Sequence, residues 1–400
     1  MSTYPSRPDP RQSRLAVTPV EFAFATAGRV VFGAGKAREL SSFVEEKGSR
    51  ALVCTGAEPG RHKDLLESLE AHFTVFPVHG EPTVALARAA AALARDDGVD
   101  LVVAIGGGSV IDLAKAVAML LGNGGDPLDY LEVVGDGRPI EQPSLPCIAV
   151  PTTAGTGAEV TPNAVLASPE HGLKASLRSP LMLPAAALVD PLLTTSCPPA
   201  ATASSGLDAL TQCLEPFVSV RANPMTDALA REGLRRAAVG LRRSYADGND
   251  IEARTDMALC ALLGGLSLAN AKLGAVHGLA GVIGGTVEVP HGVACATVLV
   301  PTIQANVRAL RARQPDSPAL ARYLEAARLL TGRADAALEE GISWIEETVT
   351  LLGIPKLAHY GLRAGHCDEV VARALKASST KGNPIELSSD ELRAVLAAAI

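Results

Sequence analysis

Aromatic residues are scarce in this chain: Phe, Tyr and Trp together make up 3% of its 400 residues. Charged residues are also few, at 20%, and their balance is acidic, with a formal net charge of −7. Such a chain presents no broad positive field to a polyphosphate backbone and few rings on which bases could stack. We therefore expect no nucleic-acid partner.

The sequence also gives no indication of paired cysteines, of a signal sequence or of a membrane span. The seven cysteines never form a C-x-x-C motif, which favours free, buried thiols in a cytoplasmic protein. Residues 1–20 carry Pro, Arg and Asp without an apolar core, so we predict a disordered lead rather than a signal peptide. The longest apolar stretch, 101–122, is interrupted by Asp112 and Lys115, so no membrane partner is expected.

The first half alternates short β-branched runs with helical patterns, which predicts a parallel sheet with crossover helices. Helices are expected at 63–71 and 83–95. The predicted strands are Arg50–Thr55, Phe73–Val78, Asp100–Ile105, Leu145–Val150 and Ala186–Val189.

After Pro191 the pattern becomes entirely helical. We therefore predict an α/β domain over 21–192 and an all-α domain over 193–400. The expected helices are 199–218, 223–246, 251–271, 275–284, 293–308, 315–330, 335–352, 367–378 and 389–400.

A glycine turn follows the strand that ends at Ile105. Its residues are Gly106, Gly107, Gly108 and Ser109. Glycines let a backbone approach a ligand closely, and Ser109 is placed to cap the next helix with Asp112 as its capping-box partner. Because a helix N-terminus with bare N–H groups attracts anions, we interpret this turn as a phosphate site. It is not the G-x-G-x-x-G fingerprint.

A threonine-rich loop, PTTAGTGAEVT, follows the strand that ends at Val150. Alone, such a loop is as compatible with an ordinary connection as with a nucleotide site. Beside the glycine turn in one parallel sheet, it becomes the other lip of a nucleotide cleft. The hydroxyl side chains concerned are Thr152, Thr153 and Thr156.

The helical half carries a sparse set of metal-ligand types. Asp208 and Gln212 are spaced i,i+4 and so share a helix face, while His277 and His291 lie further along the chain. A carboxylate with neutral imidazoles suits Zn²⁺ or Fe²⁺. Spacing alone leaves open whether these histidines bind metal or are core and capping residues.

Together these motifs resemble the iron-containing (group III) alcohol dehydrogenases. The resemblance runs from about Phe24 to Pro384 and rests on five motifs in one order. The family fold is dehydroquinate synthase-like: an α/β nucleotide-binding domain and an all-α metal-binding domain with the active site between them. The motifs are GGGSVIDLAKAVA, PTTAGTGAEVTPNAVL, GLDALTQCLEPFVS, NPMTDALAREGLRRAA and LGAVHGLAGVIGGTVEVPHGVACATVLVP.

The resemblance implies an oxidoreductase that transfers a hydride between NAD or NADP and an alcohol/aldehyde or ketone pair. It also implies a divalent Fe²⁺ or Zn²⁺ that binds the substrate oxygen as a Lewis acid, and a homo-oligomer, such as a dimer. The implied metal ligands are Asp208, His277 and His291, catalytic through the metal, with Gln212 at a fourth ligand position. The implied cofactor-binding residues are Gly106, Gly107, Gly108, Ser109, Thr152, Thr153, Thr156, Asn163 and Lys174.

Four positions depart from the family pattern. Gln212 replaces a histidine, which leaves three strong ligands plus solvent, a set that zinc accepts. Gly281 replaces a second histidine, so a proton relay through that side chain is lost. Gly56 replaces the aspartate of NAD-specific members, so Arg61 or Lys63 could pair with a 2′-phosphate and both NAD and NADP stay open. At the fourth, Glu81 stands where asparagine is common, and the sequence offers no interpretation of it.

Three alternatives remain at this point. One is a maleylacetate reductase-like enzyme that reduces an oxo-acid. Another is a dehydroquinate-synthase-like cyclase, against which the glycine, threonine and PHG motifs speak. The last is a degenerate homologue that binds nucleotide without catalysis, a reading that Gln212 and Gly281 support. The arginines of 231–243 are expected on a solvated helix face.

Overall fold

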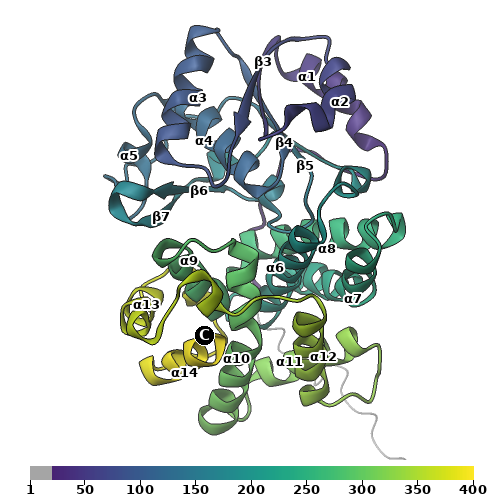
Figure 1. The fold of residues 1–400 in the computed structure, drawn as a ribbon, viewed down its shortest axis with the longest axis vertical. Helices are drawn as coiled ribbons and strands as arrows, with labels where there is room; N and C mark the ends of the chain where they lie inside the picture. The colour runs from purple at the N-terminus through teal and green to yellow at the C-terminus, as the bar shows by residue number, and fades with distance from the viewer. Residues whose placement is uncertain (1–19) are drawn as a thin grey trace, which may run out of the picture.

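The computed structural model describes residues 20–400, so the predicted disordered lead lies outside the described residues, apart from Val20. Figure 1 shows an α/β part above a helical part. Six parallel strands form one sheet in the order β1-β8-β5-β4-β2-β3. They are β1 (Val30–Phe32), β2 (Arg50–Gly56), β3 (His72–Val78), β4 (Leu101–Gly106), β5 (Cys147–Pro151) and β8 (Ala186–Val189).

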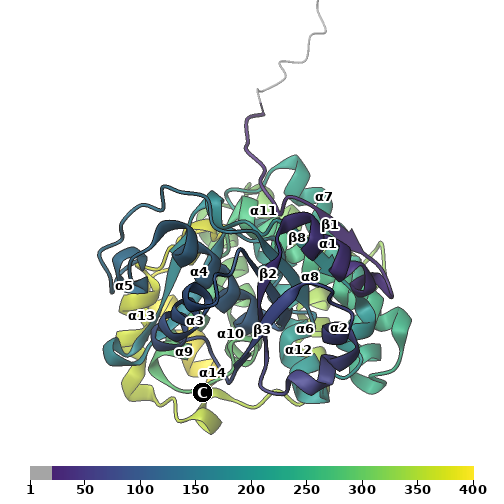
Figure 2. The same ribbon diagram turned by 90° about the horizontal axis from the view of Figure 1, so that it is seen from above.

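Helices cover both faces of this sheet because alternate residues of its buried strands point in opposite directions. Leu52 and Cys54 of β2 pack with α3 and α4, whereas Ala51 and Val53 pack with α1. Seen from above, α3 and α4 lie on one side of β2, and α1 and α2 lie on the other (Figure 2). The parallel sheet with crossover helices is confirmed. The helices are α1 (Leu40–Lys47), α2 (Lys63–Glu67), α3 (Val84–Asp96), α4 (Gly108–Asn123) and α5 (Pro127–Tyr130).

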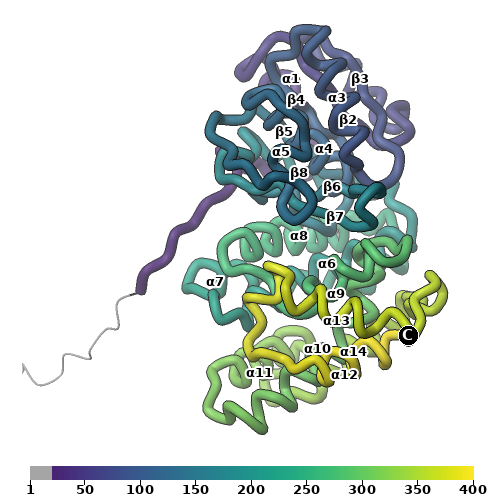
Figure 3. The backbone as a smooth tube through the Cα atoms, turned by 90° about the vertical axis from the view of Figure 1, so that its left-hand side faces the viewer, coloured from purple at the N-terminus to yellow at the C-terminus, as the bar shows by residue number. Residues whose placement is uncertain are grey.

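The sequence analysis missed the short β1 and a two-stranded antiparallel hairpin formed by β6 (Asn163–Ser168) and β7 (Leu173–Arg178). The hairpin turn includes Gly172, whose φ of +61° is a conformation that favours glycine. β7 packs against α9, and Figure 3 shows the hairpin at the junction of the two parts. The hairpin therefore borders the space between the sheet and the helices.

Each predicted helical segment of the second half overlaps a helix of the structure, with ends that differ by a few residues. α10 is long and apolar enough to span a membrane, but 78% of its apolar window is buried inside the protein, as expected of a central core helix. The domain boundary near residue 192 itself stays a prediction. The helices are α6 (Pro199–Val218), α7 (Pro224–Ala246), α8 (Ile251–Ala271), α9 (Ala275–Thr286), α10 (His291–Arg313), α11 (Pro318–Thr331), α12 (Leu338–Leu351), α13 (Cys367–Ala374) and α14 (Ser389–Ala399).

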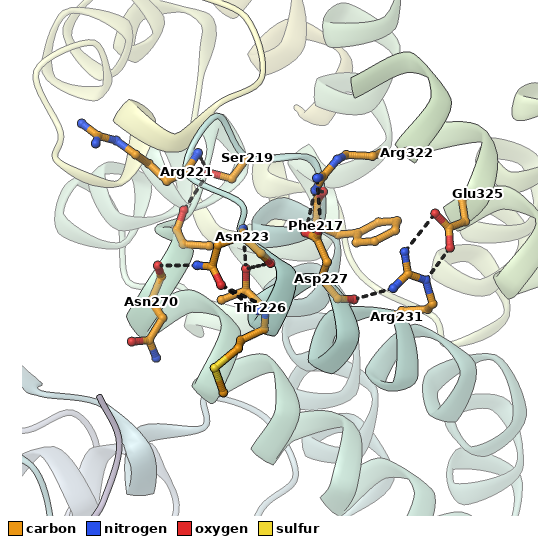
Figure 4. Close-up of polar contacts among 12 residues, drawn as sticks. Phe217, Ser219, Arg221, Asn223, Thr226, Asp227, Arg231, Asn270, Arg322 and Glu325 are labelled. Atoms are coloured by element: carbon orange, nitrogen blue, oxygen red, sulfur yellow. Dashed lines mark hydrogen bonds and ion pairs between the residues drawn. The ribbon is translucent and has the colours of Figure 1, made fainter. Parts of the chain in front are cut away.

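The solvated-face prediction for the arginines of α7 is wrong for two of them. Arg231 pairs with Glu325 of α11, and its guanidinium lies 5.3 Å from the ring centre of Phe217 (Figure 4). Arg242 lies 4.7 Å from the ring centre of Trp344 on α12. A guanidinium over an aromatic face gains from the ring quadrupole, so these side chains fasten α7 to its neighbours.

Candidate active site

The glycine turn is held against the threonine loop, as the nucleotide-cleft interpretation requires. A Cβ on Gly107 would lie 3.2 Å from Thr153 Oγ1, and one on Gly108 would lie 2.7 Å from the Thr156 side chain. None of the three glycines of the turn has a positive φ. Glycine is therefore needed there for close approach rather than for an unusual backbone conformation.

The capping role predicted for Ser109 is wrong. α4 begins at Gly108 with Gly107 as its N-cap, and no side chain caps it. Ser109 consequently lies within the first turn of the helix. Because the first N–H groups of the helix lack a side-chain acceptor, this end of α4 retains the donors that bind a phosphate.

Asp112, the predicted capping partner, instead joins a buried network around Lys115. The Lys115 ammonium lies 3.1 Å from Asp112 Oδ1 and donates to the Ala158 carbonyl at 2.9 Å and to Thr161 Oγ1 at 3.1 Å. It also donates to the carbonyl of Asn163. The Lys115 side chain is fully buried, so it fastens the end of the threonine loop to α4.

Glu159 of this loop is buried against α8, and it forms no ion pair with any residue of the described range 20–400. Burial raises the Glu159 pKa to about 7. An acid whose pKa is higher in the folded state loses stability as pH rises, here from about pH 4.5 to about pH 7. We expect Glu159→Gln to stabilise the protein at pH 8, by up to about 3 kcal/mol, and much less at pH 5.

Urea unfolding of wild type and variant at the two pH values measures this difference. Glu170→Gln, on the exposed hairpin turn, is the matched control and should leave the pH dependence unchanged. An equal pH dependence in wild type and Glu159→Gln would contradict the assignment.

The two residues predicted beside the nicotinamide ribose both lie on the hairpin. Asn163 begins β6, and Lys174 is the second residue of β7. Lys174 Nζ lies 3.3 Å from a carboxylate oxygen of Glu81 and 3.5 Å from the point where a Cβ on Gly284 of α9 would lie. Glu81 therefore acts as the counter-ion of Lys174, a role that the sequence did not indicate.

In the helical part, Asp208, His277 and His291 come together from α6, α9 and α10. Asp208 Oδ1 lies 3.2 Å from His277 Nε2 and 3.9 Å from His291 Nε2. The Cys295 side chain completes a set of four ligand-type atoms that all lie within 4.8 Å of one another. This donor set is chemically suited to a divalent cation such as zinc.

Glu215 supports the cluster and was missed by the sequence analysis. Its Oε2 lies 2.7 Å from His277 Nδ1, and its Oε1 accepts from the Val276 N–H at 2.7 Å. A carboxylate on the far nitrogen of a ligand histidine fixes the ring and its tautomer. The sequence could have indicated Glu215, because Asp208, Gln212 and Glu215 follow the i, i+4, i+7 spacing of one helix face.

The surroundings of His277 and His291 favour the protonated, positively charged form of both imidazoles. Burial opposes protonation of His277, but Cys295, Asp208 and Glu215 outweigh it and raise the His277 pKa well above its ordinary value. Cys295 likewise raises the His291 pKa to about 9, against the effect of burial. Burial opposes ionisation of Asp208, yet the two histidines hold its pKa below the usual range. Acidic groups therefore dominate the surroundings of both imidazoles.

Two departures from the family pattern, Gln212 at a ligand position and Gly281 at the position of the proton relay, differ in their surroundings. Gln212 donates through Nε2 to Asp208 Oδ2 at 2.9 Å, while its buried Oε1 has no hydrogen-bond partner. Gly281 is exposed, and a Cβ there would meet nothing within 4 Å. The absent histidine therefore leaves open space one turn along α9 from His277.

The threonine loop and the metal-ligand cluster meet at the same junction. A Cβ on Gly155 of the loop would lie 2.8 Å from Ser205 Cβ on α6, one turn before Asp208. A Cβ on Gly292, next to His291, would lie 2.3 Å from the Ser204 carbonyl oxygen of α6. These close contacts bring the sheet edge and the cluster to one place.

A glycine turn on a parallel sheet, next to helices that carry an Asp–His–His cluster, is the arrangement expected of a dinucleotide- and metal-dependent dehydrogenase. The model of the iron-containing alcohol dehydrogenase family matches residues 27–191, and the model of the C-terminal part of that family matches residues 202–400. The chain belongs to the iron-containing alcohol dehydrogenase family.

Similar proteins share this assignment along nearly the whole chain. Alcohol dehydrogenase 4 of Saccharomyces cerevisiae is 33% identical over 375 residues, 91% of this chain and 95% of that protein. A crystal structure of 1,3-propanediol oxidoreductase is 30% identical with a TM-score of 0.87, covering 95% and 100% of the two chains. Sulfoacetaldehyde reductase from Bifidobacterium kashiwanohense, solved with NAD⁺, is 28% identical with a TM-score of 0.83, covering 95% and 99%.

The predicted family, fold class and reaction type are thus confirmed. The chain is an oxidoreductase of the alcohol dehydrogenase and aldehyde reductase type, and its family depends on NAD(P) and a metal. The relatives named here are, by their names, an alcohol dehydrogenase, a propanediol oxidoreductase and an aldehyde reductase.

Proposed function

We propose that Asp208, His277 and His291 hold a divalent Fe²⁺ or Zn²⁺, and that the glycine turn and threonine loop hold NAD(P)(H). The observation that carries this proposal is the convergence of the three ligand atoms from three helices. We place the reaction in the cleft between an α/β domain over 21–192 and a helical domain over 193–400. The seven free cysteines support a cytoplasmic location.

Each residue of the site has a distinct task. Asp208, His277 and His291 would hold the cation, which when bound would supply Lewis-acid polarisation of a substrate oxygen. Glu215 fixes the His277 ring, and Gln212 orients the Asp208 carboxylate through its amide N–H. Gly281 offers no side chain to carry a proton, and its exposure lets solvent reach that turn of α9.

Turnover on a panel of small aldehydes tests the proposal. The metal-stripped protein should reduce no aldehyde, and addition of Zn²⁺ or Fe²⁺ should restore consumption of NADH or NADPH. Failure of both ions and both cofactors across the panel would refute it. Selective activity on maleylacetate would point instead to the oxo-acid reductase alternative.

The cofactor preference is testable at Gly56, the last residue of β2. A Cβ there would meet nothing within 4 Å, so an aspartate fits without a clash. We propose that the chain accepts NADPH, and we expect Gly56→Asp to lower kcat/KM for NADPH tenfold to a hundredfold. The reason is charge repulsion of about 1–3 kcal/mol between the carboxylate and the 2′-phosphate.

The activity with NADH should change little, because its adenosine ribose carries no 2′-phosphate. Gly365→Asp, in open space on the helical part, introduces the same charge elsewhere and serves as the control. Equal losses with both cofactors would contradict a 2′-phosphate at this position.

A further inference from the structure

Cys295 belongs to the metal-ligand cluster by position. It lies one helical turn after His291 on α10, so the two side chains share a helix face. Its Sγ is 3.6 Å from His291 Nε2, and the residue is buried. Its sulfur lies within 4.8 Å of the ligand atoms of Asp208, His277 and His291.

The separations in this cluster match the edges of a tetrahedral site. Bond lengths of about 2.0 Å to nitrogen and oxygen place such ligands about 3.3 Å apart, and a sulfur at about 2.3 Å lies about 3.5 Å from a nitrogen. The observed separations are 3.2 Å for Asp208–His277, 3.6 Å for Cys295–His291 and 3.9 Å for Asp208–His291. These three separations are near the tetrahedral values, and the other three are each at most 4.8 Å.

Gln212, the alternative fourth ligand, presents the wrong atom to the cluster. Its Nε2 donates to Asp208 Oδ2, and an amide nitrogen with this role does not bind a cation. The neighbouring Cys213 is also excluded, because its Sγ lies 3.8 Å from Cys260 Sγ in the helical core.

We propose that Cys295 is the fourth protein ligand of the catalytic cation, and that the resulting Asp–His–His–Cys set selects Zn²⁺ over Fe²⁺. Sulfur ligands favour zinc over harder divalent ions. Zinc sites also expand from four to five ligands during catalysis, so a substrate oxygen can still bind. This proposal rests on the cation site of the proposed function and assigns Gln212 to orienting Asp208.

Substitution of Co²⁺ into the metal-stripped protein tests the ligand directly, because a thiolate on Co²⁺ produces a near-ultraviolet charge-transfer band. Wild type should bind one Co²⁺ and show the band. Cys295→Ser should lose the band and should bind Co²⁺ at least tenfold more weakly. Loss of a residue that only supports a ligand already weakens metal binding tenfold to a hundredfold. Cys213→Ser and Gln212→Leu should both keep the band.

X-ray absorption of the zinc-loaded wild type avoids any substitution and should show one sulfur at about 2.3 Å. One bound Co²⁺ without the band, or a zinc shell without sulfur, would overturn the ligand assignment and leave the proposed function standing. Failure of wild type to bind either ion would overturn both. Persistence of the band in Cys295→Ser would also refute the assignment.

Discussion

Replacing Asp208 with asparagine is expected to lower kcat/KM at least about a thousandfold and to remove most of the bound cation. Asp208 is the one carboxylate among the clustered ligand atoms and is nearly fully buried. The amide keeps the shape of the side chain but removes the negative charge that the cation requires. A Lewis acid contributes several kcal/mol to the barrier, which corresponds to about three orders of magnitude in rate.

Glu215→Gln is expected to lower kcat/KM less than Asp208→Asn does. Because Glu215 touches His277 rather than the cation position, its loss should cost about tenfold to a hundredfold. Asp335→Asn, at an exposed ion pair with Arg333, should leave activity unchanged. Elemental analysis and steady-state kinetics of the three variants measure the series. Full activity in Asp208→Asn would show that catalysis does not depend on this cluster.

A different outcome, the absence of turnover in both proteins, would support the degenerate-homologue alternative. If wild type and Asp208→Asn both bound NAD(P) but neither turned over an alcohol or aldehyde, the chain would be a nucleotide-binding protein that has lost its chemistry. The assay therefore separates an enzyme with an unusual ligand set from a homologue without catalysis.

The sheet and the long helices could be predicted because their hydrophobic patterns are strong. The bounds predicted for α6 and α8 agree with the structure, since Pro198 and Pro199 open α6 and Asp250 caps α8. The β6–β7 hairpin was missed because its strands border the junction with the helical part. Its burial comes from contacts with α4 and α9, which local pattern does not reveal.

Site residues that lie within the family's motifs could be predicted from the sequence. Residues that join the site through contacts with distant segments could not. Asp208, His277 and His291 were found through resemblance, and the structure brings them together. Cys295 follows His291 by four residues, but the sequence analysis did not assign it to the site. Its proximity to Asp208 depends on how α6 and α10 pack, which spacing along one chain segment does not encode.

Lys115 is a second residue whose role could not be predicted from the sequence. In the sequence it served only to interrupt an apolar stretch, yet in the structure its side chain is fully buried. Three residues that lie more than 40 positions away, Ala158, Thr161 and Asn163, supply its acceptors only after the threonine loop has folded over α4. Composition therefore does not indicate that this lysine is buried.

Lys115→Met is expected to destabilise the α/β part by about 3–5 kcal/mol, the usual cost of removing one partner of a buried ion pair. The change leaves Asp112 without its counter-ion and leaves the Ala158 carbonyl and Thr161 hydroxyl without their ammonium donor. Burial already raises the Asp112 pKa despite the Lys115 charge. Because the threonine loop loses its anchor, the KM for the cofactor should rise as well.

Urea unfolding, followed together with cofactor binding, measures both effects. The double variant Asp112→Asn/Lys115→Met should be more stable than the sum of the two single losses predicts, by about 0.5–3 kcal/mol, because no unpaired carboxylate remains. Lys376→Met, at an exposed position of the helical part, controls for the loss of a lysine and should be neutral. If the single and double variants were strictly additive, the ion pair would not be coupled. The carbonyl hydrogen bonds alone would then account for the stability that Lys115 provides.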